Sequence, residues 1–290
     1  SLDAKVAALL GTSADEILIH DLAVNPASGK AYLSVSRGKG PKAPPAIVRV
    51  VPGGTLELVS LEAVKHSSLS LDDAPEDAVT GEGRRRRNKR MESITDLAYL
   101  DGKVVIAGLS NEEFASTLRS ALFPFEGGAS ATSVEIFHGA HGRLETASPI
   151  RTFLPMLVGD KPSIVASYTC TPLVTLPIAD LRDKVHVKGR TVAELGNRNR
   201  PLDMIEYEKG GKTFILIANS ARGIMKVSTE GIASVDAIES KVSGGESAGL
   251  AYDTIEDWKG IAQLDKLGTS HAVVIRIDGD ERHLEQRTLP

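Results

Sequence analysis

The chain has almost no cysteine, few aromatic residues and no long apolar run, and each shortage excludes a class of protein. Its one cysteine among 290 residues, Cys170, excludes an internal disulfide and a zinc site built from several thiolates. Aromatic residues make up 4% of the sequence, so Val, Ile, Leu and Ala must fill the core. No apolar run approaches the roughly 18 residues that a membrane-spanning helix needs. The net charge of −4 argues against binding nucleic acid over the whole surface.

What the chain has instead is an internal repeat, in which a short apolar segment is followed by a turn and a second apolar segment. The first segments are "DLAVNP" (21–26), "DLAYLD" (96–101), "LDMIEY" (202–207) and "GLAYDT" (249–254). A third and a fourth segment complete each copy, for example "AIVRVV" (46–51) and "TLELVSL" (55–61) in the first. In the same way, "SVEIF" (133–137) is predicted as the third strand of the second copy and "IASVDAI" (232–238) as the fourth strand of the copy that begins at 202. A less regular copy occupies 149–198. These segments are short, rich in β-branched residues and bounded by Gly, Pro, Asp and Asn, as strands are.

Four strands per repeat, in this order and spacing, resemble the β-propeller superfamily (WD-repeat, NHL and YVTN-type proteins). The sequence of the repeat is also similar to that of a group of bacterial propellers without a known activity. The resemblance implies an all-β, single-domain chain over 1–290, built of four-stranded antiparallel blades. The blades would span 16–64, 94–148, 149–198, 199–242 and 243–290. A sixth blade would require strands upstream of Ser1, and a β-sandwich with long loops is the alternative fold.

Residues outside the repeat predict a helix and a charged loop. Residues 1–15 predict a short helix and a cap. In "SNEEFASTLRSALFPF" (110–125), Ser110 or Asn111 can cap a helix whose apolar positions Phe114, Leu118 and Leu122 recur at i, i+4 and i+8. This pattern predicts a helical insertion in the second blade. Residues 65–93 are acidic and then basic, from Arg84 to Arg90, which predicts a mobile, solvated or self-paired loop rather than a specific nucleic-acid site.

Strand order also predicts the functional face. In a propeller, the loop entering the first strand of each blade and the loop joining strands two and three open on the same face, where polar residues converge near the axis. The entry loops hold His20, Asp21, Thr95, Asp96, Arg151, Arg200, Asp203 and Glu246. The second loops hold Arg37, Asn111, Cys170, Asn219, Arg222 and Asp265.

Three aspartates, Asp21, Asp96 and Asp203, begin the first strands at matching positions and allow three interpretations. They can accept backbone N–H bonds as structural residues. They can hold Ca²⁺ or another divalent cation, with help from an amide. They can orient arginines that bind an anionic ligand. The predicted ligand-binding residues are His20, Arg37, Asn111, Asn199, Arg200, Asn219 and Arg222.

The only thiol has no partner that the sequence identifies. A nucleophilic cysteine needs a nearby base, and His138 and His141, in "FHGAHG", are predicted to form a turn on the opposite face. Cys170 is therefore interpreted as a small buried residue.

The sequence favours a non-catalytic propeller that binds a small anionic molecule or a partner protein on the face with the insertions. The enzymatic alternative resembles the metal-dependent lactonases and gluconolactonases, which hold a divalent cation near the axis; Asp21, Asp96, Asp203 and Asn219 are the nearest equivalents. A third alternative is a scaffold without a small-molecule site. No G-x-S-x-G, H-E-x-x-H or P-loop motif is present. The start at Ser1 and the style of the repeat favour a periplasmic or secreted protein over a cytoplasmic one.

Overall fold

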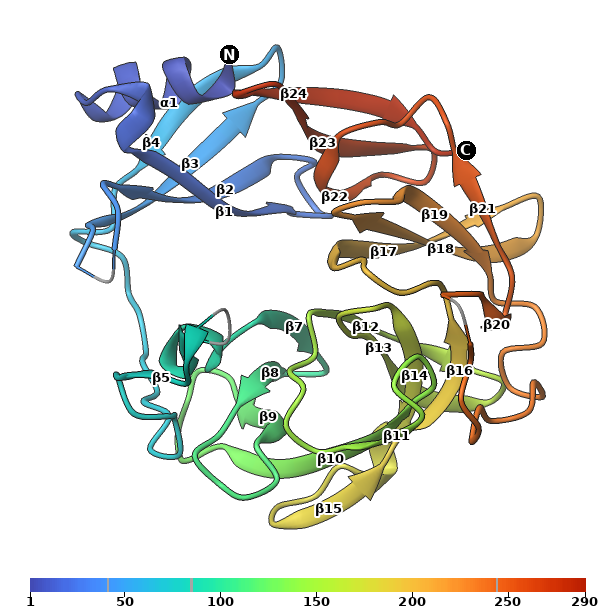
Figure 1. The fold of residues 1–290 in the computed structure, drawn as a ribbon. Coiled ribbons are helices and arrows are strands. Elements are labelled where there is room, and N and C mark those ends of the chain that lie inside the picture. Colours follow the sequence, from blue (N-terminus) through green and yellow to red (C-terminus); the bar gives the residue numbers. More distant parts are fainter. Residues whose placement is uncertain (41, 84–85, 244) are drawn as a thin grey trace.

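Five sheets of three or more strands surround a central axis in the computed structural model, which describes residues 1–40, 42–83, 86–243 and 245–290 (Figure 1). Neighbouring strands are antiparallel except for one parallel pair. The predicted propeller is confirmed, and the number of blades is five. Among the described residues no helix is long and apolar enough to cross a membrane.

The blades follow one another along the chain. The first contains β1 (Ile17–Val24), β2 (Ala31–Arg37), β3 (Pro45–Val51) and β4 (Thr55–Val59). The second contains β7 (Asp96–Leu100), β8 (Lys103–Leu109), β9 (Ser116–Leu122), β10 (Ser130–His138), β11 (Arg143–Glu145) and β15 (Val185–Lys188). The third contains β12 (Thr152–Val158), β13 (Lys161–Ser167), β14 (Pro172–Pro177), β16 (Arg190–Glu194) and β20 (Ala248–Gly249). The fourth contains β17 (Pro201–Lys209), β18 (Lys212–Asn219), β19 (Gly223–Ser228) and β21 (Tyr252–Ile255), and the fifth β22 (Ile261–Leu267), β23 (His271–Asp278) and β24 (Glu281–Thr288).

The helix predicted over 110–125 is wrong, because this segment supplies β9, which pairs with β8 and β10. Residues four apart lie on one face of a strand as well as on one face of a helix, so the spacing of Phe114, Leu118 and Leu122 could not distinguish the two. Of the three, only Leu118 is buried. The segment predicted as third strand, 133–137, is therefore the fourth strand, β10, and runs in the opposite direction to the one expected.

The boundary between the fourth and fifth blades also differs from the prediction. Residues 232–238, expected to form the fourth strand of the fourth blade, make a turn in which Val235 N donates to Gly231 O. The Arg190 guanidinium donates to three carbonyl groups of this turn, at Ile232, Ala233 and Val235, and so holds the segment in the turn conformation. β21, expected to begin the fifth blade, completes the fourth instead by pairing with β19.

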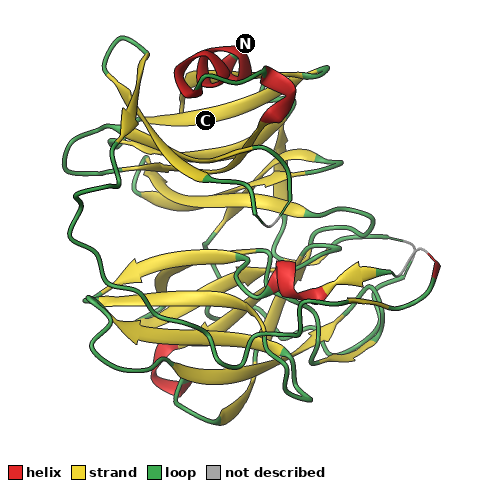
Figure 2. Ribbon diagram, turned by 90° about the vertical axis from the view of Figure 1, so that its left-hand side faces the viewer, coloured by secondary structure: helices red, strands yellow, loops and turns green. Residues whose placement is uncertain are grey.

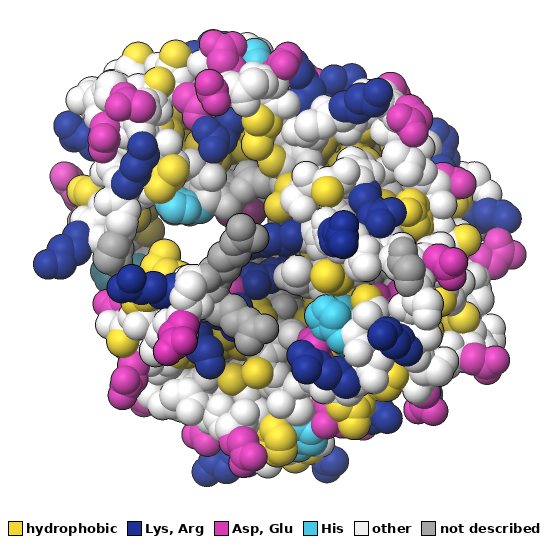
Figure 3. Space-filling view, viewed as in Figure 1, with side chains coloured by type: hydrophobic (Ala, Val, Ile, Leu, Met, Phe, Trp, Pro, Cys, Tyr) yellow, Lys and Arg dark blue, Asp and Glu magenta, His cyan; other side chains and the backbone are white. Residues whose placement is uncertain are grey.

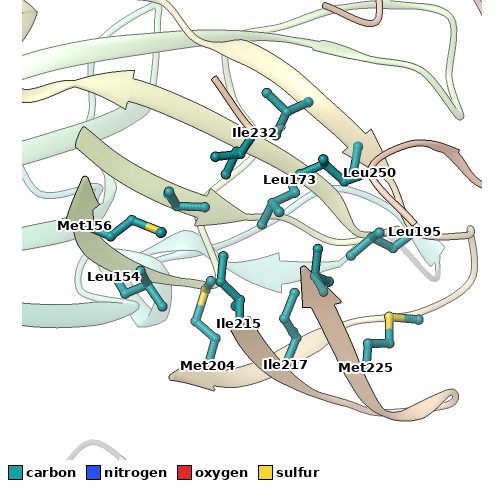
Figure 4. Close-up of a cluster of buried hydrophobic side chains, with 14 of the residues drawn as sticks. Leu154, Met156, Leu173, Leu195, Met204, Ile215, Ile217, Met225, Ile232 and Leu250 are labelled. Carbon is teal, nitrogen blue, oxygen red and sulfur yellow. The ribbon is translucent and has the colours of Figure 1, made fainter. Parts of the chain in front are cut away.

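The core is divided among the interfaces between blades. One cluster of buried apolar side chains joins the third and fourth blades, with Leu154, Leu173 and Ile215 among its members (Figure 4). Comparable clusters join the second blade to the third, the fourth to the fifth, and the fifth to the first. Figure 1 shows the first and second blades separated and linked by the segment between β4 and β7. The described residues thus form four packed interfaces around five blades.

The predicted N-terminal helix is confirmed as α1 (Leu2–Leu10), which lies on the outer side of the ring (Figure 2). Ser1 caps it by accepting a bond from Ala4 N, and Gly11 ends it in the left-handed conformation, at φ 65°. The helix contacts β4 and β24, and the Asp3 carboxylate holds Arg282 at 2.8 Å. It therefore fastens the first blade to the last.

The charged segment between β4 and β7 is attached to the second blade, contrary to the mobile loop that we predicted. It contains β5 (Val79–Thr80), β6 (Arg87–Asn88) and a 3-10 helix, Lys89–Glu92. The attachment is Arg119 on β9, whose side chain is 1% exposed. Its Nε lies 2.9 Å from both oxygens of Asp73, and its other nitrogens donate to Ser93 O and Leu109 O. Arg84 and Arg85, part of the predicted basic run, lie outside the described residues.

Candidate functional site

The aspartates of the inner strands join neighbouring blades. Asp96 on β7 accepts from Leu97 N of its own strand and, at 2.8 Å, from Phe153 N of the third blade. Asp203 on β17 in the same way accepts from Leu264 N of the fifth blade at 2.9 Å.

Asp265, which we placed in a second loop, lies on inner strand β22 and accepts from Val24 N of the first blade at 2.6 Å. Asp21 accepts only from Leu22 N among the described residues. Each carboxylate that bridges two blades does so at an interface with a packed core, and Asp21 faces the separated side of the ring.

Burial dominates the ionisation of these carboxyl groups. Desolvation raises the pKa of Asp203 well above its usual value and that of Asp96 to about 6, although the backbone N–H bonds oppose it. Desolvation also raises the pKa values of Asp21 and Asp265. The aspartates have a structural use, and the divalent-cation site predicted at Asp21, Asp96 and Asp203 stays a prediction, as does the lactonase-like activity.

The predicted ligand residues of the first blade bond locally. His20 Nε2 lies 2.9 Å from Ser36 Oγ, and the His20 carbonyl accepts from Gln263. The guanidinium of Arg37 donates to Gly11 O at the end of α1. Asn111 is exposed, and its N–H donates to Asp73 O of the attached segment.

The remaining predicted residues lie around the loop that enters the fourth blade. Asn199 is 2% exposed; its Oδ1 accepts from Ala221 N, and its Nδ2 has no partner among the described residues. Asn219 is buried, and its Nδ2 donates to Ile217 O. Arg222 donates to Asn197 O. Among the described residues no hydrogen bond or ion pair joins Arg37, Arg200 and Arg222, which we predicted to bind one ligand together.

Arg200 has different companions, which we call the arginine cluster: Arg87, Arg151, Arg200 and Glu92. Arg151 donates to Glu92 at 2.7 Å and to Thr169 Oγ1 at 3.1 Å, and Arg87 lies 3.8 Å from the other Glu92 oxygen. Desolvation, and then the charge of Arg151, lower the pKa of Arg200 despite the nearby Glu92. Figure 3 shows Lys and Arg side chains beside the central opening of this face.

A second cluster was missed by sequence reasoning. His138, His141 and Cys170 place their potential ligand atoms within 4.8 Å of one another, and they are the only such group of three His, Cys, Asp or Glu side chains among the described residues. The expectation that the histidines lie on the face opposite Cys170 is wrong. Because β9 is an extra strand, β10 ends on the entry face, and the turn after it meets the turn between β13 and β14 that holds Cys170. Recognising Ser116–Leu122 as a strand in the sequence would have placed both histidines on the same face as Cys170.

The thiol and the imidazole alter each other's ionisation. Burial lowers the pKa of His138, but its contacts with the Cys170 thiol and with Glu145 outweigh this and raise the pKa to about 9. The same contact with His138 lowers the pKa of Cys170 more than burial raises it. The pKa of Glu145 is lowered, because bonds from His138, Ser148 and His141 overcome its burial. Cys170 is half-exposed rather than buried as we expected.

A cavity of about 700 Å³ lies against the outer part of the second blade. The attached segment lines one side with Leu71 and Asp73, and the start of β9 lines the other with Thr117 and Arg119. Glu112 and Glu113 add acidic groups at its edge. It contains none of the predicted ligand residues.

Comparison with known proteins shows no family for this chain. No family model matches the chain, and no curated protein matches its sequence. Among solved structures, the soluble aldose sugar dehydrogenase (Asd) of Escherichia coli is 12% identical over 94% of this chain and 82% of its own, with a TM-score of 0.37. A glucose dehydrogenase is also 12% identical, over 93% and 82%, with a TM-score of 0.35. At this identity the similarity concerns the fold, and dehydrogenase activity is a property of those proteins.

Proposed function

We propose that the protein is a binding module for a small anionic ligand, which it takes up at the arginine cluster on the entry face of the propeller. The observation that supports this is that Arg87 and Arg151 both lie against the single carboxylate of Glu92, while Arg200 is near enough for the charges of Arg151 and Glu92 to affect its pKa. The Arg200 guanidinium has no hydrogen-bond acceptor among the described residues. An anion between Arg151 and Arg200 would relieve the repulsion between them.

Arginine suits this task because its planar fork of donors matches the oxygens of a carboxylate or phosphate, and it stays charged when partly desolvated. The backbone fixes Arg200 well: Pro201 follows it, Arg200 N donates to Ser220 Oγ, and Ser220 N donates to Arg200 O. Glu92 keeps Arg151 in place through its 2.7 Å ion pair. The Arg151 side chain and the backbone of Arg200 are therefore held in place before a ligand arrives, which reduces the entropy lost on binding.

The test is isothermal titration of the protein with citrate and with inorganic phosphate. We expect Arg200→Gln to weaken binding of the better of the two anions by about 10- to 100-fold, because a hydrogen bond to a charged group contributes about 1.5–3 kcal/mol. Arg182→Gln, on the outer rim, removes the same charge and should leave binding unchanged. Equal affinities of the two variants, or no binding of either anion to the native protein, would refute the proposal.

A further inference from the structure

We propose that His138, His141 and Cys170 form a binding site for a transition-metal ion, with Zn²⁺ as its natural occupant by donor chemistry. The three residues come from two blades. The histidines lie at the end of β10 and in the turn after it, and Cys170 lies between β13 and β14. This site shares no residue with the arginine cluster and does not depend on the function proposed there.

Glu145 orients both imidazole rings for metal binding. Its Oε2 lies 3.0 Å from His138 Nδ1, and its Oε1 lies 2.6 Å from His141 Nδ1. Because Nδ1 of each ring faces Glu145, Nε2 is the nitrogen left for a metal, which displaces any proton on it when it binds. A histidine that binds a metal through one nitrogen usually donates the other N–H to a carboxylate. Ser148 Oγ holds Glu145 in turn, at 2.6 Å.

An unpartnered buried nitrogen marks the position of the ion. The side chain of His138 is 2% exposed, and its Nε2 has no hydrogen-bond partner among the described residues. One of the ring nitrogens of His138 lies within 4.8 Å of the Cys170 sulfur and of a His141 nitrogen. In a tetrahedral zinc site, with bonds of about 2.0 Å to nitrogen and 2.3 Å to sulfur, such donors lie roughly 3.5 Å apart. The cluster needs little movement to reach that geometry.

The backbone around Cys170 aims the thiol at the histidines. Cys170 and Thr171 both adopt left-handed conformations, at φ 66° and 58°. Cys170 N donates to Asn199 O at 2.7 Å, and the Thr171 hydroxyl donates to Gly196 O at 2.7 Å. The loop that enters the fourth blade therefore clamps the tight turn that presents the sulfur.

The donor set defines the class of ion. Two imidazoles and one thiolate favour Zn²⁺, Cu²⁺ or Co²⁺, whereas Ca²⁺ and Mg²⁺ require oxygen ligands. The His141 side chain is 44% exposed, so the ion would be accessible on one side. Three protein ligands and an open fourth position are the arrangement that zinc takes where it also binds water or a substrate.

The experiment is metal binding by the intact protein and its variants. The purified protein is stripped with a chelator, incubated with ZnCl₂, desalted and analysed for zinc; Co²⁺ is added separately and its thiolate charge-transfer absorption is recorded. We expect about one zinc per chain, a cobalt–thiolate band, and loss of both in Cys170→Ser. His141→Ala, at an exposed position, should lower the zinc affinity by more than tenfold, and Glu145→Gln by about 10- to 100-fold. His271→Ala, the control, should bind like the native protein.

Two results would overturn the proposal: no retained zinc in the native protein, or equal zinc binding by His141→Ala and the control. Reaction of Cys170 with a disulfide reagent provides a second measurement, which does not require zinc to stay bound during desalting. Zinc should slow this reaction at least tenfold in the native protein. A thiol that reacts at the same rate with and without zinc would mean a free nucleophile and would likewise overturn the metal site. Unchanged melting temperatures of the metal-free variants show that each is folded.

Discussion

Removing Asp73 should destabilise the protein more than removing its partner Arg119, although Asp73 is the more exposed of the two. The Asp73 side chain is 28% exposed and lies in an irregular segment, whereas the Arg119 side chain is 1% exposed and lies on a central strand. Surface position alone would predict the opposite order. The physical reason is that each substitution leaves a different charged group without its partner: a buried guanidinium in one case and a partly exposed carboxylate in the other.

Asp73→Ala leaves a buried guanidinium with only two carbonyl acceptors, Ser93 O and Leu109 O. Removing one partner of a buried ion pair costs about 3–5 kcal/mol, because the remaining charge is uncompensated. Arg119→Met leaves a carboxylate that water can reach and two carbonyl groups without their donor. We expect this to cost about 2–3 kcal/mol, since an unsatisfied buried acceptor costs about 1–3 kcal/mol and the apolar replacement offsets part of it.

The double variant gives the sharpest test. Asp73→Ala with Arg119→Met removes both charges, so it should be more stable than Asp73→Ala alone, even though it carries one more substitution. Urea unfolding followed by the fluorescence of the buried Trp258 measures the free energies. Asp72→Ala, exposed and without a bond among the described residues, is the control and should stay within about 0.5 kcal/mol of the native protein. A double variant less stable than Asp73→Ala would refute the reasoning.

Two further predictions concern the inner strands. Burial raises the pKa of Asp96 from 3.8 to about 6 in the folded protein. At pH values between these two, Asp96 is therefore protonated in the folded protein and largely ionised in the unfolded chain. The free energy of unfolding must fall as pH rises through this range. Between pH 4 and pH 7 the native protein should lose about 2 kcal/mol more than Asp96→Asn in urea unfolding, because part of the full effect of 1.36 kcal/mol per pKa unit is already lost below pH 4; parallel pH profiles would contradict this. Gly108→Ala should displace Ser93 and with it Glu92, because a Cβ at position 108 would lie 2.0 Å from Ser93 O. We expect a loss of about 1–3 kcal/mol together with weaker anion binding, and unchanged anion binding in a destabilised Gly108→Ala would show that Glu92 is positioned independently.

The repeat in the sequence was sufficient for the architecture, because each inner strand has the same short apolar pattern and ends in Gly, Pro or Asp. The matching aspartates were also visible, and a structural role in accepting backbone N–H bonds was one of the interpretations that the sequence left open, but the sequence did not show that some of these bonds join two blades. Asp265 was not recognised as an aspartate of an inner strand, because the connection before its strand differs in length from the others and shifts the repeat. The arginine cluster was visible only in part: Arg151 and Arg200 stood in the predicted entry loops, but Arg87 and Glu92 reach them from a segment expected to be mobile.

The sequence by itself predicted a propeller of five recognisable blades, the N-terminal helix and the face on which Arg200 lies, because these follow from local pattern and strand order. Only the tertiary structure decided where His138 and His141 lie. Apolar residues four positions apart lie on one face of a helix and also on one face of a strand, so the spacing in 110–125 fits both. Pairing with β8 and β10 makes 116–122 a strand. One added strand reverses the direction of the next, so it moved both histidines across the molecule to Cys170. Apolar spacing alone does not encode this pairing, although the strands concerned are neighbours in the chain.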